Sequence, residues 1–214
     1  MKILVAGATG TVGQHVVKQG LSRGHAITTV ARHPERLKTT DQNLTKVAAD
    51  ILDPAAIEPQ LNGIDAVIST VGVGASKAPT TLYSKGTESL LRGMSQHGVE
   101  RIVVISSQVA DHWAHQSLLK LWTVLPLLQH FLGATYDDMR RMERVLWESR
   151  AQFTGIWAPR IRDHSATGKY RLDESEPLPR GMTITAPTWL QLYWTSRSAT
   201  TSGGSTCSSR TSCS

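Results

Sequence analysis

Short apolar runs alternate with amphipathic stretches along most of this chain. The runs at residues 3–6 and 102–105 consist almost wholly of Val, Ile, Leu and Ala. Between such runs, apolar side chains recur at helical spacing, as at Val12, Val16 and Leu21. Continuous apolar runs are typical of parallel strands buried on both faces, whereas the helices that cover them need one apolar face. The pattern therefore predicts an α/β protein with a doubly wound parallel sheet.

The boundaries of the expected elements follow from these runs and from local start and stop signals. Gly24 ends the first helix, and Asp53 before Pro54 marks a helix start, because aspartate caps a helix and proline fits its first position. Strands are expected at residues 2–6, 26–31, 45–49, 66–70, 101–105 and 153–157. Longer helices are expected at residues 11–23, 81–96 and 135–150. We expect one domain over residues 1–185.

A glycine-rich turn follows the first apolar run directly. Its three glycines are spaced GxxGxxG between a strand and a helix. Glycine allows a tight turn and the close approach of a phosphate, and the free N–H groups of a helix start favour an anion. An ordinary strand-to-helix turn is the alternative, but this setting favours a Rossmann-type dinucleotide site. The expected cofactor contacts here are Gly7, Thr9, Gly10, Thr11, Val12 and Gly13.

The residues after the second strand distinguish between the two nicotinamide cofactors. An acidic residue at this place holds the ribose hydroxyls of NAD, whereas an arginine accommodates the 2′-phosphate of NADP. This chain has Arg32 there and Arg36 shortly after it. We expect Arg32 to bind the phosphate of NADP (NADPH) and Arg36 to assist, although a helix-surface charge is an equal alternative for Arg36.

Other candidate residues lie at the ends of later strands, where open parallel sheets bind their ligands. Asp50 and Ile51 follow the third strand and are expected beside the adenine. The fourth strand ends in small residues that bring bare backbone to the cofactor, namely Thr70, Val71 and Gly72. Ser106 and Ser107 end the fifth strand, and we expect their hydroxyls to face the reactive nicotinamide edge, a simple turn being the alternative.

Charge and composition exclude several other classes of function. The net charge is +6, from 23 basic and 17 acidic residues, but the basic residues are scattered, so we expect no nucleic-acid partner. The longest apolar stretch, at residues 118–132, is interrupted by Lys120 and Pro126. We also expect no leader before the first strand. We therefore expect no membrane partner and a cytoplasmic location. His112 and His115 lack a third ligand at a recognisable spacing, so no metal site is expected.

Five segments have sequence motifs typical of one family. They are GATGTVG at 7–13, GIDAVI at 63–68, HGVERIV at 97–103, DMRRME at 138–143 and TGKYR at 167–171. Together they resemble the atypical short-chain dehydrogenase/reductases with a single NAD(P)H-binding domain, most of all the biliverdin reductase B, or flavin reductase, group. The resemblance covers residues 1 to about 185. It implies a parallel sheet, NADPH over the strand ends, and a small open pocket that reduces flavins or related conjugated substrates.

The resemblance also implies roles for single residues. It makes Ser107 a pocket hydroxyl near the hydride and implies a small planar substrate, with a monomer or weak homodimer expected. It assigns cofactor contact to Thr9, Gly10, Thr11, Val12, Arg32, Arg36, Thr70, Ser106 and Pro159.

One departure from the wider superfamily bears on catalysis. Short-chain dehydrogenases use a Tyr-x-x-x-Lys pair, in which the lysine lowers the pKa of the tyrosine, a general acid. Here Tyr136 is followed at the lysine position by Arg140, which does not readily exchange protons. Two hypotheses remain. The first is an NADPH-dependent reductase of flavins, quinones or similar planar acceptors, with Ser107 orienting the acceptor and Tyr136 lining the pocket. The second is an NADP-sensing, NmrA-like regulatory protein without turnover.

Two further segments each allow two interpretations. Residues 117–132 are apolar and contain a tryptophan, which fits either a lid over the substrate or a helix packed on the core. Residues 186–214 depart from the rest, because thirteen of the last twenty residues are Ser or Thr and both cysteines fall there. Composition predicts a disordered tail. A shifted reading frame is the sharper hypothesis, since the alternative frame permits an amphipathic helix start after Thr185.

Overall fold

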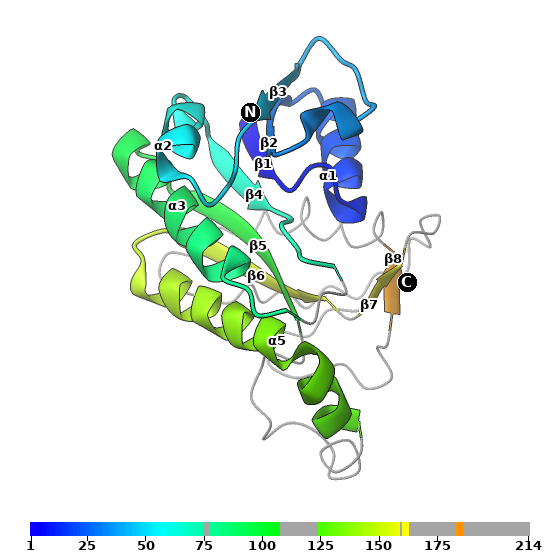
Figure 1. Cartoon of the computed structure of the whole chain (residues 1–214). Helices are drawn as coiled ribbons and strands as arrows, with labels where there is room; N and C mark the ends of the chain where they lie inside the picture. Colours follow the sequence, from blue (N-terminus) through cyan, green and yellow to red (C-terminus); the bar gives the residue numbers. More distant parts are fainter. Residues whose placement is uncertain (75–77, 108–123, 159, 163–182, 186–214) are drawn as a thin grey trace, which may run out of the picture.

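A six-stranded parallel sheet forms the centre of the protein (Figure 1). The computed structural model describes residues 1–74, 78–107, 124–158, 160–162 and 183–185. The strands of the sheet are β1 (Lys2–Ala6), β2 (Ala26–Ala31), β3 (Leu44–Ala48), β4 (Ala66–Ser69), β5 (Arg101–Ser107) and β6 (Gln152–Ala158). Their order across the sheet is β3-β2-β1-β4-β5-β6, which confirms the doubly wound, Rossmann-type fold.

Helices cover both faces of this sheet, as Figure 1 shows. On one face lies α1 (Thr11–Ser22). The opposite face carries α2 (Pro54–Ile57), α3 (Leu82–His97) and α5 (Val124–Glu148), with α3 in contact with both others. Two 3₁₀ turns, η1 (Pro34–Arg36) and η2 (Glu58–Leu61), lie in the connections. A separate pair of short parallel strands is formed by β7 (Arg160–Arg162) and β8 (Thr183–Thr185).

Alternation along the strands divides the core into two layers. In β1, Ile3 and Val5 pack with Val16 of α1, whereas Leu4 lies in the layer beneath α3 and α5. Both layers are closed to solvent, since Ile3 is 1% exposed and Leu4 0%. Successive side chains of a strand point to opposite faces, so a strand covered on both faces must be apolar throughout. This explains the continuous apolar runs of the sequence.

The strand predictions are confirmed within one or two residues, but one helix prediction is wrong at its start. A helix was expected to begin at residue 135, whereas α5 begins at Val124 and runs unbroken to Glu148. Pro126 does not break it, because proline is tolerated in the first turn, where backbone N–H groups have no partner inside the helix. Residues 124–132 therefore belong to this helix, while 118–123 of the same apolar stretch lie outside the described residues.

The start signal before α2 is confirmed by its hydrogen bonds. Asp53 Oδ1 accepts from the N–H groups of Ala55, at 3.0 Å, and Ala56, at 3.4 Å. The helix makes only one turn before η2 continues the chain at Glu58. Pro159 and residues 186–214, which carry one cofactor prediction and the tail predictions, lie outside the described residues.

Candidate functional site

The two loops that leave β1 and β4 lie side by side at the point where the strand order reverses. After β1 the chain crosses to α1 on one face, and after β4 it continues to α3 on the other (Figure 1). The backbone N–H and the hydroxyl of Thr70 both donate to the carbonyl of Ala6, each at 2.9 Å. Open α/β sheets bind their ligands at this place, because the diverging loops leave a crevice outside the strand ends.

Two glycines allow this close contact, Gly7 in the first loop and Gly13 in the first turn of α1. Gly7 has a φ of +79°, and a Cβ there would lie 2.8 Å from the carbonyl carbon of Thr70 and from the N of Val71. A Cβ on Gly13 would press on the carbonyl oxygen of Gly7 and lie 2.7 Å from the Cα of Ala8. A side chain at Gly7 would therefore force the two loops apart, and one at Gly13 would push the start of α1 away from the first loop. The sequence motif and the loop geometry agree.

The start of α1 is open to an anionic ligand. Gly10 is the cap residue, and among the described residues no side chain caps this helix start by a hydrogen bond. Thr11 is exposed at the first helical position, and Val12 is half-buried. The carbonyl of Thr9 accepts from the side-chain amide of Gln14 at 3.1 Å, which holds the turn. Uncapped N–H groups at a helix start carry partial positive charge, so this cradle fits the pyrophosphate of a nicotinamide dinucleotide.

The two arginines after β2 are both exposed. Arg36 belongs to η1, and neither Arg32 nor Arg36 makes a side-chain hydrogen bond or ion pair with any described residue. The acid between them, Glu35, lies 3.3 Å from the Nδ1 of His33. Within the part of the chain that the structure describes, both guanidinium groups are thus available to a phosphate.

The pair after β3 is held by local contacts. Asp50 Oδ1 accepts the N–H of Leu52 at 3.0 Å and thereby shapes the turn. Ile51 is only 8% exposed and packs against α3, where a Cβ on Gly86 would lie 3.2 Å from it. Contact of Asp50 and Ile51 with an adenine stays a prediction. Only the small exposed part of Ile51 would take part in such a contact.

The hydroxyl of Ser106 is directed toward α5. It donates to Oε1 of Glu143 at 2.5 Å, and the side chain is 2% exposed. A contact between Ser106 and the cofactor would therefore use the oxygen lone pairs, since the hydrogen is already donated. Ser107 pairs with Ala158 through the strand register, but its side chain lies outside the described residues. Glu143 ends the DMRRME segment at 138–143, but no role was predicted for it, because its partner Ser106 is 37 residues away in the sequence.

Two tyrosines from different helices lie near each other beside the loop after β4. Tyr136 of α5 is half-buried, and both burial and the neighbouring Tyr83 raise its pKa above the ordinary value of 10.0. Tyr83, in the first turn of α3, is buried; burial also raises its pKa, a direction that Asp138 reinforces and the hydrogen bond from Val73 opposes. Both phenols therefore remain neutral near pH 7. No role was predicted for Tyr83 from the sequence, in which Lys85 follows it at a spacing that does not match Tyr-x-x-x-Lys.

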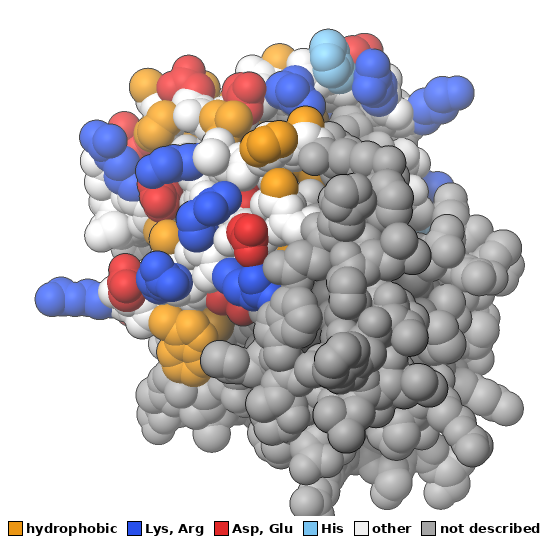
Figure 2. All heavy atoms as spheres, turned by 60° about the horizontal axis from the view of Figure 1, so that its bottom comes forward, with side chains coloured by type: hydrophobic (Ala, Val, Ile, Leu, Met, Phe, Trp, Pro, Cys, Tyr) orange, Lys and Arg blue, Asp and Glu red, His pale blue; other side chains and the backbone are white. Residues whose placement is uncertain are grey.

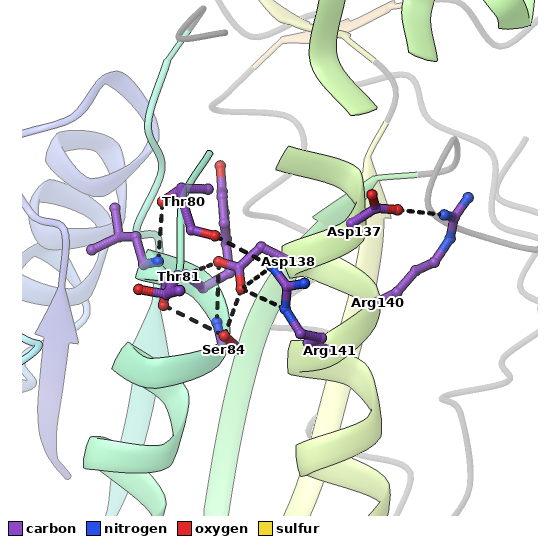
Figure 3. A network of polar contacts seen from close by, with 9 residues as sticks. Thr80, Thr81, Ser84, Asp137, Asp138, Arg140 and Arg141 are labelled. Carbon is purple, nitrogen blue, oxygen red and sulfur yellow. Dashed lines mark hydrogen bonds and ion pairs between the residues drawn. The ribbon is translucent and has the colours of Figure 1, made fainter. Parts of the chain in front are cut away.

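Arg140, at the lysine position relative to Tyr136, is engaged elsewhere. Its Nη1 lies 2.9 Å from Oδ1 of Asp137 on the outer side of α5 (Figure 3). A nearby cation lowers the pKa of a phenol, but the pKa of Tyr136 is raised. The structure thus provides no described cation that activates this tyrosine.

A buried carboxylate joins α5 to the start of α3, as Figure 3 shows. Asp138 is 0% exposed and accepts the N–H of Tyr83 at 2.8 Å, the N–H of Ser84 at 3.4 Å and the hydroxyl of Ser84 at 2.5 Å. Arg141 completes the network, with its Nη2 at 3.4 Å from Asp138 Oδ1 and from the carbonyl of Thr80. This network fixes the two tyrosine-bearing helices to each other.

Basic and acidic side chains are interspersed over the described part of the face in Figure 2. Among the described residues, no helix has the length and apolar character needed to cross a membrane. Nor do those residues contain a group of three or more His, Cys, Asp or Glu side chains that could hold a metal ion. His112 and His115 lie outside them.

Comparison with known proteins identifies the family. Residues 7–187 match a family described as NAD(P)H-binding. The chain belongs to this NAD(P)H-binding family. It is 28% identical over 188 residues to an uncharacterized chloroplastic protein of Arabidopsis thaliana, a match that covers 84% of this chain and 66% of that protein. The chain thus spans just under two thirds of that relative, and other curated relatives are matched over as little as 12% of their length.

Solved structures show the same fold in other members of the NAD(P)-binding class. A short-chain dehydrogenase/reductase from Veillonella parvula, in complex with NADP, superposes with a TM-score of 0.75 at 15% identity, covering 92% of this chain and 87% of that one. ChuY, an anaerobilin reductase from Escherichia coli O157:H7, superposes with a TM-score of 0.74 at 16% identity, covering 93% and 91%. These likenesses support the Rossmann-type fold of the described residues.

Proposed function

We propose that this protein is an NADPH-dependent reductase that transfers a hydride to a flavin, a quinone or a similar planar acceptor. The observation that carries the proposal is the cradle at the β1–β4 switch point, where Gly7 and Gly13 leave the start of α1 open to a dinucleotide. Arg32 and Arg36, exposed at the end of β2, favour the 2′-phosphate of NADP. The resemblance to the biliverdin reductase B, or flavin reductase, group supports the class of acceptor.

The rest of the proposed site extends along the ends of four further strands, β3 to β6. Thr70, Val71 and Gly72 border the cofactor after β4, and Asp50 and Ile51 do so after β3. At β5, Ser106 contacts the cofactor and Ser107 orients the acceptor, while Pro159 follows β6. Tyr136 lines the acceptor pocket.

The bound cofactor supplies the hydride, and this chain's residues supply position and shielding. The acceptor gains the hydride and then a proton, which we assign to solvent because the pKa of Tyr136 is raised and not lowered. In a flavin or quinone the negative charge left by the hydride is delocalised, so protonation can follow without a tuned acid. Tyr136→Phe is therefore expected to reduce turnover only modestly, whereas loss of a general acid costs about 10²–10⁴-fold.

A second candidate function is binding without turnover, as in an NADP-sensing, NmrA-like regulatory protein. The observation that favours it is the pairing of Arg140 with Asp137, which leaves Tyr136 without the partner that short-chain dehydrogenases use. We propose a monomer or weak homodimer in the cytoplasm, with residues 1–185 as the functional domain, and both the location and the boundary stay predictions.

One assay separates the two functions. NADPH oxidation is followed by absorbance with a panel of flavins and quinones, and NADPH binding is measured separately by its fluorescence. The matched control is Gly13→Ala, in which the added methyl meets the backbone of Ala8 and closes the cradle. Turnover in the unmodified protein that the variant lacks supports the reductase. Tight NADPH binding without oxidation by any acceptor favours the sensor instead.

A further inference from the structure

Tyr83 connects the loop after β4 to α5. Its phenol oxygen accepts the backbone N–H of Val73 at 3.3 Å, and its own backbone N–H donates to Oδ2 of Asp138 at 2.8 Å. The side chain is 7% exposed, so these contacts are shielded from water. A single residue therefore joins a loop, the start of α3 and a buried carboxylate of α5.

The loop at residues 70–74 is held at both of its ends. Thr70 is bound to the carbonyl of Ala6, beside the glycine turn. At the other end, Val73 is bound by the phenol of Tyr83, and a Cβ on Gly72 would lie 3.6 Å from the same oxygen. The bare backbone between the two ends is the part that we assign to the cofactor, and Tyr83 lies directly behind it.

We infer that Tyr83 is a positioning residue of this site, whose phenol fixes the backbone of Gly72 and Val73 for the cofactor. The inference deepens the proposed function and rests on it for the place of the cofactor. Tyr83 does not meet the reacting atoms. It acts through the loop, and its position near Tyr136 places the same fixed loop beside the proposed acceptor pocket.

A purely space-filling role would not require the hydroxyl. Phenylalanine fills nearly the same volume, and a buried hydroxyl costs free energy unless it has a partner. The partner here is the N–H of a loop residue, which in the described part of the chain has no other acceptor. The hydroxyl thus constrains the loop and not merely the core.

The test compares Tyr83→Phe with a control from the next residue, Ser84→Ala. The first variant removes the bond to Val73 but keeps the ring and the backbone bond to Asp138. The second removes the hydroxyl bond to Asp138 and leaves the phenol in place. Three quantities are measured in the full chain: the dissociation constant of NADPH by fluorescence, amide hydrogen exchange at Val73, and the melting temperature.

Tyr83→Phe is expected to weaken NADPH binding and to speed exchange at Val73, each by about two- to tenfold, as for the loss of one uncharged hydrogen bond. Ser84→Ala is expected to lower the melting temperature at least as much while leaving both other quantities unchanged. Unchanged NADPH affinity in Tyr83→Phe, with or without faster exchange at Val73, would overturn the inference. Equal losses of affinity in the two variants would also overturn it, because general destabilisation would then explain both.

Binding, and not turnover, is the readout of this test. If the unmodified protein binds NADPH but reduces no acceptor, the proposed reductase activity fails while the role of Tyr83 is still decided by the affinities. If the unmodified protein reduces an acceptor but Tyr83→Phe binds NADPH as tightly as the unmodified protein does, the role of Tyr83 fails while the reductase activity stands. The two failures are therefore distinguishable.

Discussion

Removing the carboxylate of Asp138 is expected to destabilise the whole protein. The side chain is 0% exposed and accepts three hydrogen bonds from the first turn of α3, two from backbone N–H groups and one from the hydroxyl of Ser84. Those N–H groups have no acceptor within their own helix, because they belong to its first turn. In Asp138→Ala they would be left buried without a partner.

The size of the effect follows from burial and charge. Leaving one buried donor without an acceptor costs about 1–3 kcal/mol, and Asp138→Ala leaves two backbone N–H groups in that state, so we expect a loss of about 2–6 kcal/mol. The ion pair with Arg141 adds little to this value, since that arginine side chain is 52% exposed and can return to water. Asp138→Asn keeps one acceptor oxygen and the side-chain volume, so we expect a smaller loss of about 1–3 kcal/mol, the value of one unsatisfied group.

Urea unfolding measures these losses, and Asp137→Asn is the matched control from the adjacent position. Asp137 is 53% exposed and pairs with Arg140 at 2.9 Å, an arrangement worth at most about 0.5 kcal/mol. If Asp138→Ala does not fold, the comparison of the two Asn variants still decides the question. Losses from Asp138→Asn no larger than those from Asp137→Asn would refute the role of Asp138 as the acceptor of the first-turn N–H groups of α3.

Three other predictions concern the cofactor and pH. Arg32→Asp is expected to abolish or reverse a preference for NADPH over NADH in fluorescence titrations. Arg92→Asp, an exposed control on α3, should leave this preference unchanged. Equal affinities of the unmodified protein for NADPH and NADH would contradict the phosphate contact. Gly13→Ala should lose NADPH binding altogether, because the methyl meets the backbone of the glycine turn. The pKa values of Tyr83 and Tyr136 are raised above 10.0 in the folded protein, so the unfolded chain loses these protons first as pH rises. The free energy of unfolding should therefore fall as pH rises beyond 10.0. In urea titrations, Tyr83→Phe should show a shallower fall.

The sheet and the cradle could be predicted because their signals are local. A strand buried on both faces must be apolar at every position, so β1 and β4 are visible as runs. The glycines at 7 and 13 are required by the close approach of two loops, and their spacing between a strand and a helix is already present in the sequence. Boundaries were less reliable. Pro126 suggested an interruption, yet α5 accommodates it in its first turn.

The polar contacts that hold the site could not be predicted, because their partners are distant in the sequence. Asp138 and Tyr83 are 55 residues apart, and Ser106 and Glu143 are 37 apart. On a helix, a buried aspartate and an exposed one have the same local sequence signal, as Asp138 and its neighbour Asp137 show. Only the packing of α3 against α5 distinguishes them.

The environment of Tyr136 bears on our proposal about the class of acceptor. Burial and the neighbouring phenol of Tyr83 both raise its pKa, and the arginine that replaces the usual lysine is paired with Asp137. A ketone that receives a hydride becomes a strongly basic alkoxide, so its reduction needs an acid positioned beside the oxygen. A flavin or a quinone spreads the same charge over its rings and can wait for a proton from solvent. The arrangement of these described residues therefore supports our proposal of conjugated planar acceptors over simple ketones.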